Sequence, residues 1–174
     1  MTRILDGGAE VDQAKGDGKT FLFVACEHGH VDLVRLLLDK GAEVDRATDD
    51  GTTPLIVACE NGHIDAARLL LEKGADVHKA TNRKRTPLHG VCDVRWCEDC
   101  HIEVARLLLA NGADVDREDE SGKTPVANAE SRKHQDIVAL LVEHKAGLQT
   151  APAPAPASAA EAPAPAGPGL EPCL

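Results

Sequence analysis

The apolar and polar positions of residues 50–82 predict two short helices. Between residues 63 and 73, apolar side chains recur at helical spacing with charged residues between them, which is typical of a helix that buries one side. An earlier apolar stretch at residues 55–60 follows Thr53 and Pro54. Threonine suits a helix entry because its oxygen accepts a free backbone N–H, and proline suits the first helical position because it loses no hydrogen bond there.

The same pattern returns along the chain at a fixed distance of 33 residues. Thr53 corresponds to Thr20 and Thr86 at this spacing. Leu70 corresponds in the same way to Leu37. A period of this length indicates a repeat architecture. Because a pair of short helices cannot cover its own apolar side, each unit must stack on its neighbours, and the units together form a one-dimensional solenoid.

The motifs of the central unit resemble those of the ankyrin repeat. Thr-Pro-Leu at residues 53–55 is followed by Gly-His at residues 62–63 and by Leu-Leu-Glu-Lys-Gly-Ala-Asp-Val at residues 70–77. The resemblance covers about residues 1–148. It implies an all-α ankyrin-repeat solenoid of helix-turn-helix repeats joined by finger-like β-turn loops. The expected units are a partial repeat at residues 1–16 and repeats at about residues 17–49, 50–82, 83–119 and 120–147.

The two ends of the array differ in character. The chain opens in the middle of a repeat, which is explained either by a longer array or by an apolar flank that pairs with another chain. The last repeat replaces the repeated cysteine by Glu130 and the Gly-His pair by Lys133-His134, and a polar outer side of this kind is what a terminal repeat requires. The Pro/Ala-rich residues 149–174 lack large apolar side chains and are expected to be disordered.

Composition narrows the classes of function. The chain has 174 residues, a formal net charge of -10 and only 2% aromatic residues, so the core must be aliphatic. We find no signal peptide and no run of apolar residues long enough to span a membrane, which favours an intracellular protein, cytoplasmic or nuclear. The acidity argues against nucleic-acid binding, since that requires many cations.

The sequence offers little for catalysis. Gly-Lys-Thr at residues 18–20 and 122–124 resembles the end of a phosphate-binding loop, but the first glycine of that motif is absent from both sites. Four histidines occupy one repeat position, so a single structural role explains all of them: His30, His63, His101 and His134. We therefore expect no enzyme and no cofactor.

An insertion of five residues lengthens the loop between the two helices of the third repeat. Cys92, Cys97, Cys100 and His101 lie within ten residues there, which is a zinc-like set of ligands. A metal- or redox-responsive module is the alternative function that follows. Against it, Cys92 falls at the register of Cys26 and Cys59, where a buried thiol is expected. We expect no metal, and these four residues are only candidates.

The favoured function is a non-catalytic protein-binding module or scaffold, with a structural segment of a larger ankyrin protein as a further alternative. The resemblance implies that a partner lies along the concave surface made by the fingers and first helices. The basic third finger is suited to an acidic or phosphorylated segment, because arginine binds carboxylate and phosphate through paired hydrogen bonds. The candidate contacts are Arg46, Asp49, Asp50, Lys79, Arg83, Arg85, Arg117 and Glu118 from the fingers, Glu27, His28, Glu60 and Asn61 from the helices, and Trp96 from the loop.

Overall fold

The computed structural model describes residues 11–93 and 99–150, the last three by their backbone alone. Within these ranges the chain forms four antiparallel helix pairs, which confirms the predicted all-α solenoid. The expected partial repeat at residues 1–16 and the expected disordered tail lie mostly outside the described residues. The helices are α2 (Phe21–Glu27), α3 (Val31–Asp39), α4 (Pro54–Glu60), α5 (Ile64–Glu72), α6 (Pro87–Cys92), α7 (Asp99–Ala110), α8 (Pro125–Arg132) and α9 (Gln135–Thr150).

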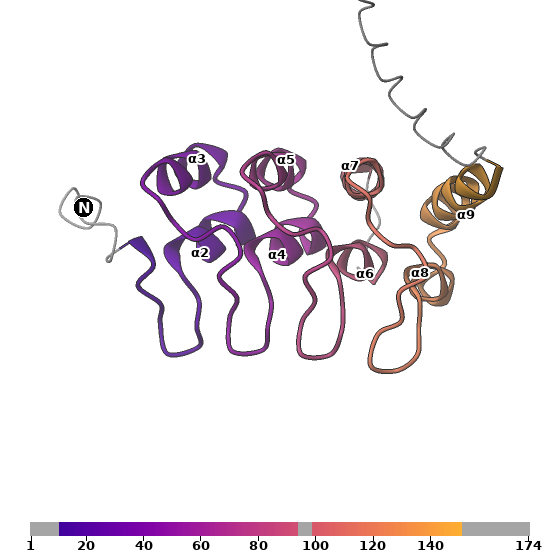
Figure 1. Cartoon of the computed structure of the whole chain (residues 1–174), viewed down its shortest axis with the longest axis horizontal. Helices are drawn as coiled ribbons and strands as arrows, with labels where there is room; N and C mark the ends of the chain where they lie inside the picture. Colours follow the sequence, from indigo (N-terminus) through magenta and orange to yellow (C-terminus); the bar gives the residue numbers. More distant parts are fainter. Residues whose placement is uncertain (1–10, 94–98, 151–174) are drawn as a thin grey trace, which may run out of the picture.

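The helices stack in two rows, with the fingers as a third layer (Figure 1). The first helices of the repeats, α2, α4, α6 and α8, form the inner row, and each packs against the next. The second helices, α3, α5, α7 and α9, form the outer row. The fingers project from the inner row on the side opposite the outer helices. The face made by the fingers and the inner helices, called the inner face below, therefore runs along the whole described array.

Threonine begins each inner helix, as the sequence predicts. The Oγ1 atom of Thr20 accepts the backbone N–H of Phe23 at 3.1 Å, and Thr53 accepts that of Ile56 at 3.2 Å. Thr124 does the same for α8. Such a cap satisfies a backbone donor that has no partner inside the helix and is worth about 1 kcal/mol.

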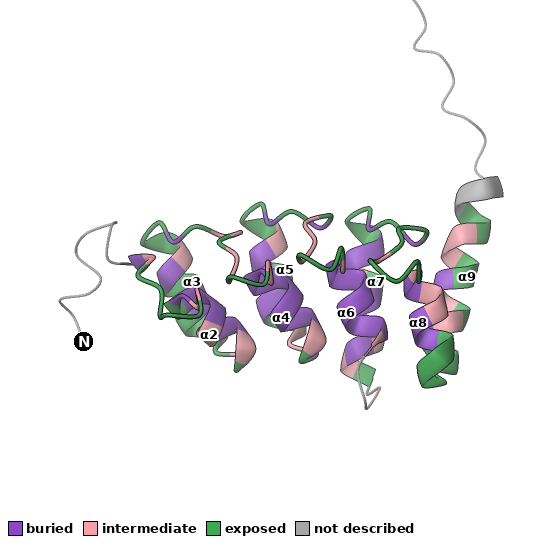
Figure 2. Ribbon diagram, turned by 90° about the horizontal axis from the view of Figure 1, so that it is seen from below, coloured by how far each residue is buried: buried purple, intermediate pink, exposed green. Residues whose placement is uncertain are grey.

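Leucines in register form the core between the two rows. Leu37, Leu70, Leu108 and Leu141 are all buried, with exposed fractions of 3% or less. Figure 2 shows α4 and α6 as almost wholly buried. Three thiols also lie in this core at one register of the inner helices, as expected, and burial raises the pKa of the Cys26 thiol to about 12. The buried thiols are Cys26, Cys59 and Cys92.

Histidine at the start of an outer helix links one repeat to the preceding one. The Nε2 atom of His63 lies 3.2 Å from the backbone oxygen of Glu27, and that of His101 lies 3.3 Å from the backbone oxygen of Glu60. A Cβ atom at Gly29 would lie 2.6 Å from the His63 ring, and Gly29 has a φ of +68°. The Gly-His motif thus joins neighbouring repeats through a contact that only glycine permits, and the single structural role expected for the histidines is confirmed at these two positions.

The first described repeat exposes apolar side chains on its outer flank. Phe21, Leu33 and Leu36 are 42%, 41% and 41% exposed. Their equivalents one repeat later, Pro54, Ala66 and Leu69, are buried. Leu36 and Leu69 are the same residue type, so their difference in exposure follows from their position in the stack.

Candidate partner-binding face

Four fingers share one hairpin geometry. In each finger the backbone N–H of the first residue donates to the carbonyl of the residue four positions later, at 2.9 to 3.0 Å. Neighbouring fingers are joined as well, for example by the N–H of Asn82, which donates to the Asp50 oxygen at 3.0 Å. The fingers therefore form a continuous edge instead of separate loops. They are residues 15–19, 48–52, 81–85 and 119–123, called the first to fourth fingers.

The turn of each finger needs a left-handed residue. Gly18, Gly51 and Gly122 have φ values of +79°, +84° and +73°. The third finger, which lacks the glycine, holds Lys84 at the same position with a φ of +59°. The third finger thus has the same backbone conformation as the others at an energetic cost, since a side chain in this conformation is disfavoured by roughly 1–2 kcal/mol.

An acidic groove of about 400 Å³ lies between the first two fingers and helices α2 and α4. It carries five carboxylates and one ammonium group above a floor of Phe23 and Val57. The lysine is already held, because Lys19 Nζ lies 3.1 Å from a Glu27 carboxylate oxygen and 5.2 Å from the centre of the Phe23 ring. The residues lining it are Asp17, Lys19, Phe23, Glu27, Thr48, Asp49, Asp50, Thr52, Val57 and Glu60.

Two carboxyl groups of the acidic groove titrate differently. The hydroxyl of Thr48 donates to Asp50 at 2.5 Å and the backbone N–H of Thr52 donates at 3.1 Å, and these bonds hold the pKa of Asp50 below its usual range. Burial raises the pKa of Glu60, an effect that nearby Arg85 opposes. Since Glu60 ends α4, it lies between this groove and the next repeat.

A second groove, of about 670 Å³, lies between the third and fourth fingers and helices α6 and α8. We call it the arginine groove. It carries four cationic and three acidic side chains, whereas the acidic groove carries one cationic and five acidic ones, so the two grooves of this face differ in charge. The residues lining it are Arg83, Arg85, Asp93, Asp119, Glu120, Ser121, Lys123, Asn128, Ser131 and Arg132.

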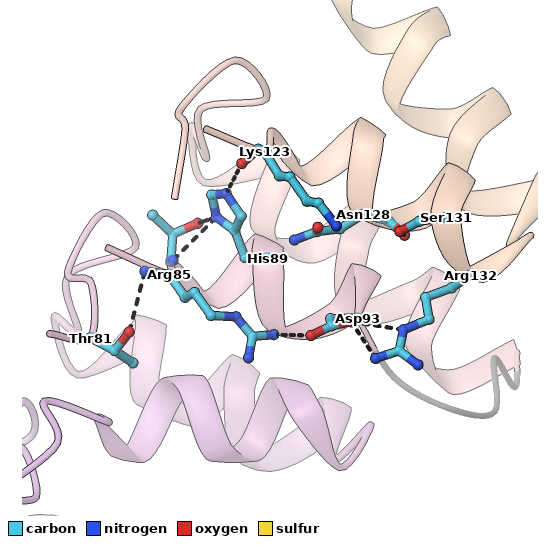
Figure 3. Close-up of polar contacts among 9 residues, drawn as sticks. Thr81, Arg85, His89, Asp93, Lys123, Asn128, Ser131 and Arg132 are labelled. Atoms are coloured by element: carbon cyan, nitrogen blue, oxygen red, sulfur yellow. Dashed lines mark hydrogen bonds and ion pairs between the residues drawn. The ribbon is translucent and has the colours of Figure 1, made fainter. Parts of the chain in front are cut away.

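Asp93 lies between two guanidinium groups in this groove (Figure 3). Its Oδ2 atom is 2.8 Å from Nη2 of Arg85, and its Oδ1 atom is 2.8 Å from both Nε and Nη2 of Arg132. The two guanidinium groups thus share one carboxylate as their salt-bridge partner. Arg83 and Lys123 take part in no salt bridge in the part of the chain that the structure describes, and both are exposed.

His89 links the start of α6 to the fourth finger, beside the arginine groove. It is fully buried on α6, where its Nδ1 atom lies 3.2 Å from the Thr86 backbone nitrogen and its Nε2 atom lies 3.2 Å from the Lys123 backbone oxygen (Figure 3). Burial lowers the pKa of His89, although its bond to Lys123 and the charge of Asp119 oppose the shift. A neutral ring therefore joins the third repeat to the fourth finger.

The predicted contact residues fall into four groups. Six of them line the two grooves: Glu27, Asp49, Asp50, Glu60, Arg83 and Arg85. Others are exposed outside the grooves: His28, Arg46, Asn61, Arg117 and Glu118. Lys79 is half-buried and its ammonium group donates to the Asp45 backbone oxygen at 3.0 Å. Trp96 lies outside the described residues.

Sequence reasoning missed part of the arginine groove. Lys123 occupies the finger position of Arg85, Thr52 and Lys19, so the repeat register is a signal that could have found it. Arg132 and Ser131 end α8 in the fourth repeat, whose match to the other repeats is weakest there. Their place in the groove depends on how α8 packs beside α6.

The metal hypothesis for the inserted loop stays a prediction. Cys92 is buried, and the Cys100 sulfur lies 3.6 Å from His101 Nδ1. Cys97 lies outside the described ranges. Within residues 11–93 and 99–150 no group of three or more His, Cys, Asp or Glu side chains could hold a metal ion. In the same ranges no helix is both long enough and apolar enough to cross a bilayer.

Comparison with known families agrees with the geometry. The model of a family described as ankyrin repeats (3 copies) matches residues 1–81 and also residues 77–151. A search of curated proteins gave no match. The family match covers both grooves.

Proposed function

Since the chain belongs to the ankyrin-repeat family, we propose that it is a protein-binding module without catalytic activity, whose partner lies along the inner face. The observation that carries this proposal is the surplus of charged groups in the two grooves. Arg83 and Lys123 are exposed without a salt bridge to the described residues, and Asp17 and Asp49 are likewise exposed on the acidic side. Packing does not need these side chains, because the core is aliphatic.

The residues that we propose as contacts are those of the sequence prediction, with most weight on the six that line the grooves. Side chains in a groove lose more water on binding than those on an open surface, and their charge interactions are correspondingly stronger. The exposed residues outside the grooves would contribute as a rim. We infer that Lys79 contributes less, because its ammonium group already has a backbone partner.

We further propose that the arginine groove receives an acidic or phosphorylated segment of the partner. Arg85 and Arg132 are fixed by Asp93, which supports this proposal because a guanidinium already held in place loses less side-chain entropy when it binds. Arg83 and Lys123 add charge at the rim. Each exposed contact is expected to be worth about 1 kcal/mol or less and to weaken with salt.

A position-specific crosslinking experiment tests the binding face. A photo-crosslinking residue would replace Asp49 or Arg83 on the inner face and, as matched controls, Arg68 or Arg106, which are exposed on the outer helices α5 and α7. After incubation of the full chain with cell extract, mass spectrometry should identify the same protein at both inner positions and not at the outer ones. Equal capture at the outer positions would contradict the proposal.

Charge reversal tests the acidic segment. The double variant Arg83→Glu, Lys123→Glu should bind the captured partner about tenfold more weakly at low ionic strength, because two contacts of this size together amount to about 1.4 kcal/mol. The control Arg68→Glu, Arg106→Glu makes the same change of net charge on the outer face and should bind as wild type does. If both double variants lose affinity equally, the effect is one of net charge and the groove is not the site.

A further inference from the structure

In each groove of the inner face, one side chain already lies against groups of opposite charge. In the acidic groove, Lys19 lies between the Glu27 carboxylate and the face of the Phe23 ring. In the arginine groove, Asp93 lies between the guanidinium groups of Arg85 and Arg132 (Figure 3). The first groove thus stabilises an ammonium group and the second stabilises a carboxylate.

Neither Lys19 nor Asp93 forms salt bridges with all the oppositely charged groups around it. Beside Lys19, the carboxylates of Asp17, Asp49 and Asp50 line the acidic groove, and none of them forms a salt bridge within the described part of the array. Beside Asp93, the groups of Arg83 and Lys123 form no such pair either, and with Asp119 and Glu120 also in the lining the groove keeps an excess of one positive charge. Each groove can therefore accept a further side chain of the kind that it already holds.

We propose that the partner is an extended segment with two separated blocks of charge, a cationic block that lies in the acidic groove and an anionic block that lies in the arginine groove. This inference rests on the proposed function, since it assumes that the inner face binds the partner. Beyond the proposed function, it specifies the order in which charges follow one another along the partner. Like charges facing each other cost affinity, so the arrangement excludes the reverse placement.

The fold also fixes the spacing of the two blocks. The acidic groove lies between α2 and α4 and the arginine groove between α6 and α8, which places them two inner helices apart. Packed helices lie about 8–10 Å apart, so the groove centres are separated by about 16–20 Å. An extended chain covers this distance with about six residues.

Synthetic peptides test the charge order directly. The first peptide has a run of lysines, a spacer of about six glycine and serine residues and a run of equally many glutamates. The second has the same composition with lysine and glutamate alternating, so both have zero net charge. Fluorescence anisotropy with the full chain should show about tenfold tighter binding of the first peptide at low ionic strength, and high salt should remove the difference.

Variants and crosslinks then assign each block to its groove. Asp49→Lys and Arg83→Glu should each weaken binding of the block peptide, whereas Glu72→Lys and Arg68→Glu, exposed on α5, should not. A photo-crosslinker on the lysine end should attach within residues 17–60, and one on the glutamate end within residues 83–132. The opposite assignment would overturn the proposal.

The two proposals fail in different ways. Equal binding of both peptides to the inner face would overturn the charge order alone. Attachment of both peptides to the outer helices would overturn the inner face as the binding surface, and with it the proposed function.

Discussion

The Nε2 atom of His89 lies 3.2 Å from the backbone oxygen of Lys123, so a ring inside the third repeat holds the finger of the fourth. The other ring nitrogen faces Thr86, whose backbone N–H donates to it. Because one nitrogen must accept and the other must donate, the ring binds both partners only when it is neutral. This contact couples the arginine groove to the buried part of α6.

Replacing His89 should loosen that coupling. His89→Ala should lower the free energy of unfolding by about 1–3 kcal/mol, because it leaves the buried Thr86 N–H without a partner and removes one of the two hydrogen bonds that the Lys123 carbonyl accepts. His89→Gln should lose less, since glutamine at this helix position can still bind the N–H of the capping threonine. Urea denaturation of the two variants measures the difference. Equal stability of wild type and the alanine variant would show that the contact contributes nothing.

The same contact predicts a dependence on pH. Burial holds the pKa of His89 below its unfolded value of about 6.5, so the unfolded chain binds the proton more readily. The stability that His89 provides is therefore complete above the unfolded pKa and decreases as the pH falls through it toward the folded pKa. In urea denaturation, wild type should have a higher free energy of unfolding than His89→Gln at neutral pH, and this advantage should shrink on acidification. An advantage that stays constant or grows would contradict the expected direction.

The leucine ladder should dominate the stability of the array. Leu70→Ala on α5 should lower the free energy of unfolding by about 2–5 kcal/mol, because Leu70 is fully buried and the change leaves a cavity. Leu36→Ala on α3 serves as the control, since this leucine is 41% exposed and should cost clearly less. Both urea midpoints are compared with that of wild type. A Leu70→Ala midpoint equal to that of wild type would refute the packing.

The third finger should be stabilised by restoring its glycine. Lys84→Gly removes a left-handed backbone cost of roughly 1–2 kcal/mol and adds about 0.5–1 kcal/mol of chain entropy to the unfolded state, for a net gain of up to about 1.5 kcal/mol. The reverse change at the equivalent position, Gly51→Lys, should destabilise, since its Cβ would lie 2.8 Å from the Asn82 backbone nitrogen. Thermal midpoints measure both effects. A loss of stability in Lys84→Gly would show that the lysine is compensated by its own contacts.

The repeat and its local chemistry can be read from the order of residue types alone. The helix pairs are predicted by the spacing of 33 residues, the capping threonines and the leucines at one register. Each of these features depends on interactions within one repeat or between two repeats of the same pattern. Repetition made these features visible. Lys84 shows where this prediction ends. The sequence shows that the third finger lacks the glycine of the other fingers, but only the structure shows that Lys84 adopts the left-handed conformation in its place.

Which charges face one another depends on how the repeats pack. The sequence identifies Arg85 as part of a basic finger, but its partner Asp93 and the second arginine, Arg132, lie eight and 47 residues further along the chain. His89 likewise meets a finger 34 residues away. A salt bridge or a buried hydrogen bond depends on distances of a few ångströms, which the stacking of α6 on α8 sets and which no periodicity of residue types specifies. The division of the inner face into an acidic and an arginine groove is therefore a property of the packed array.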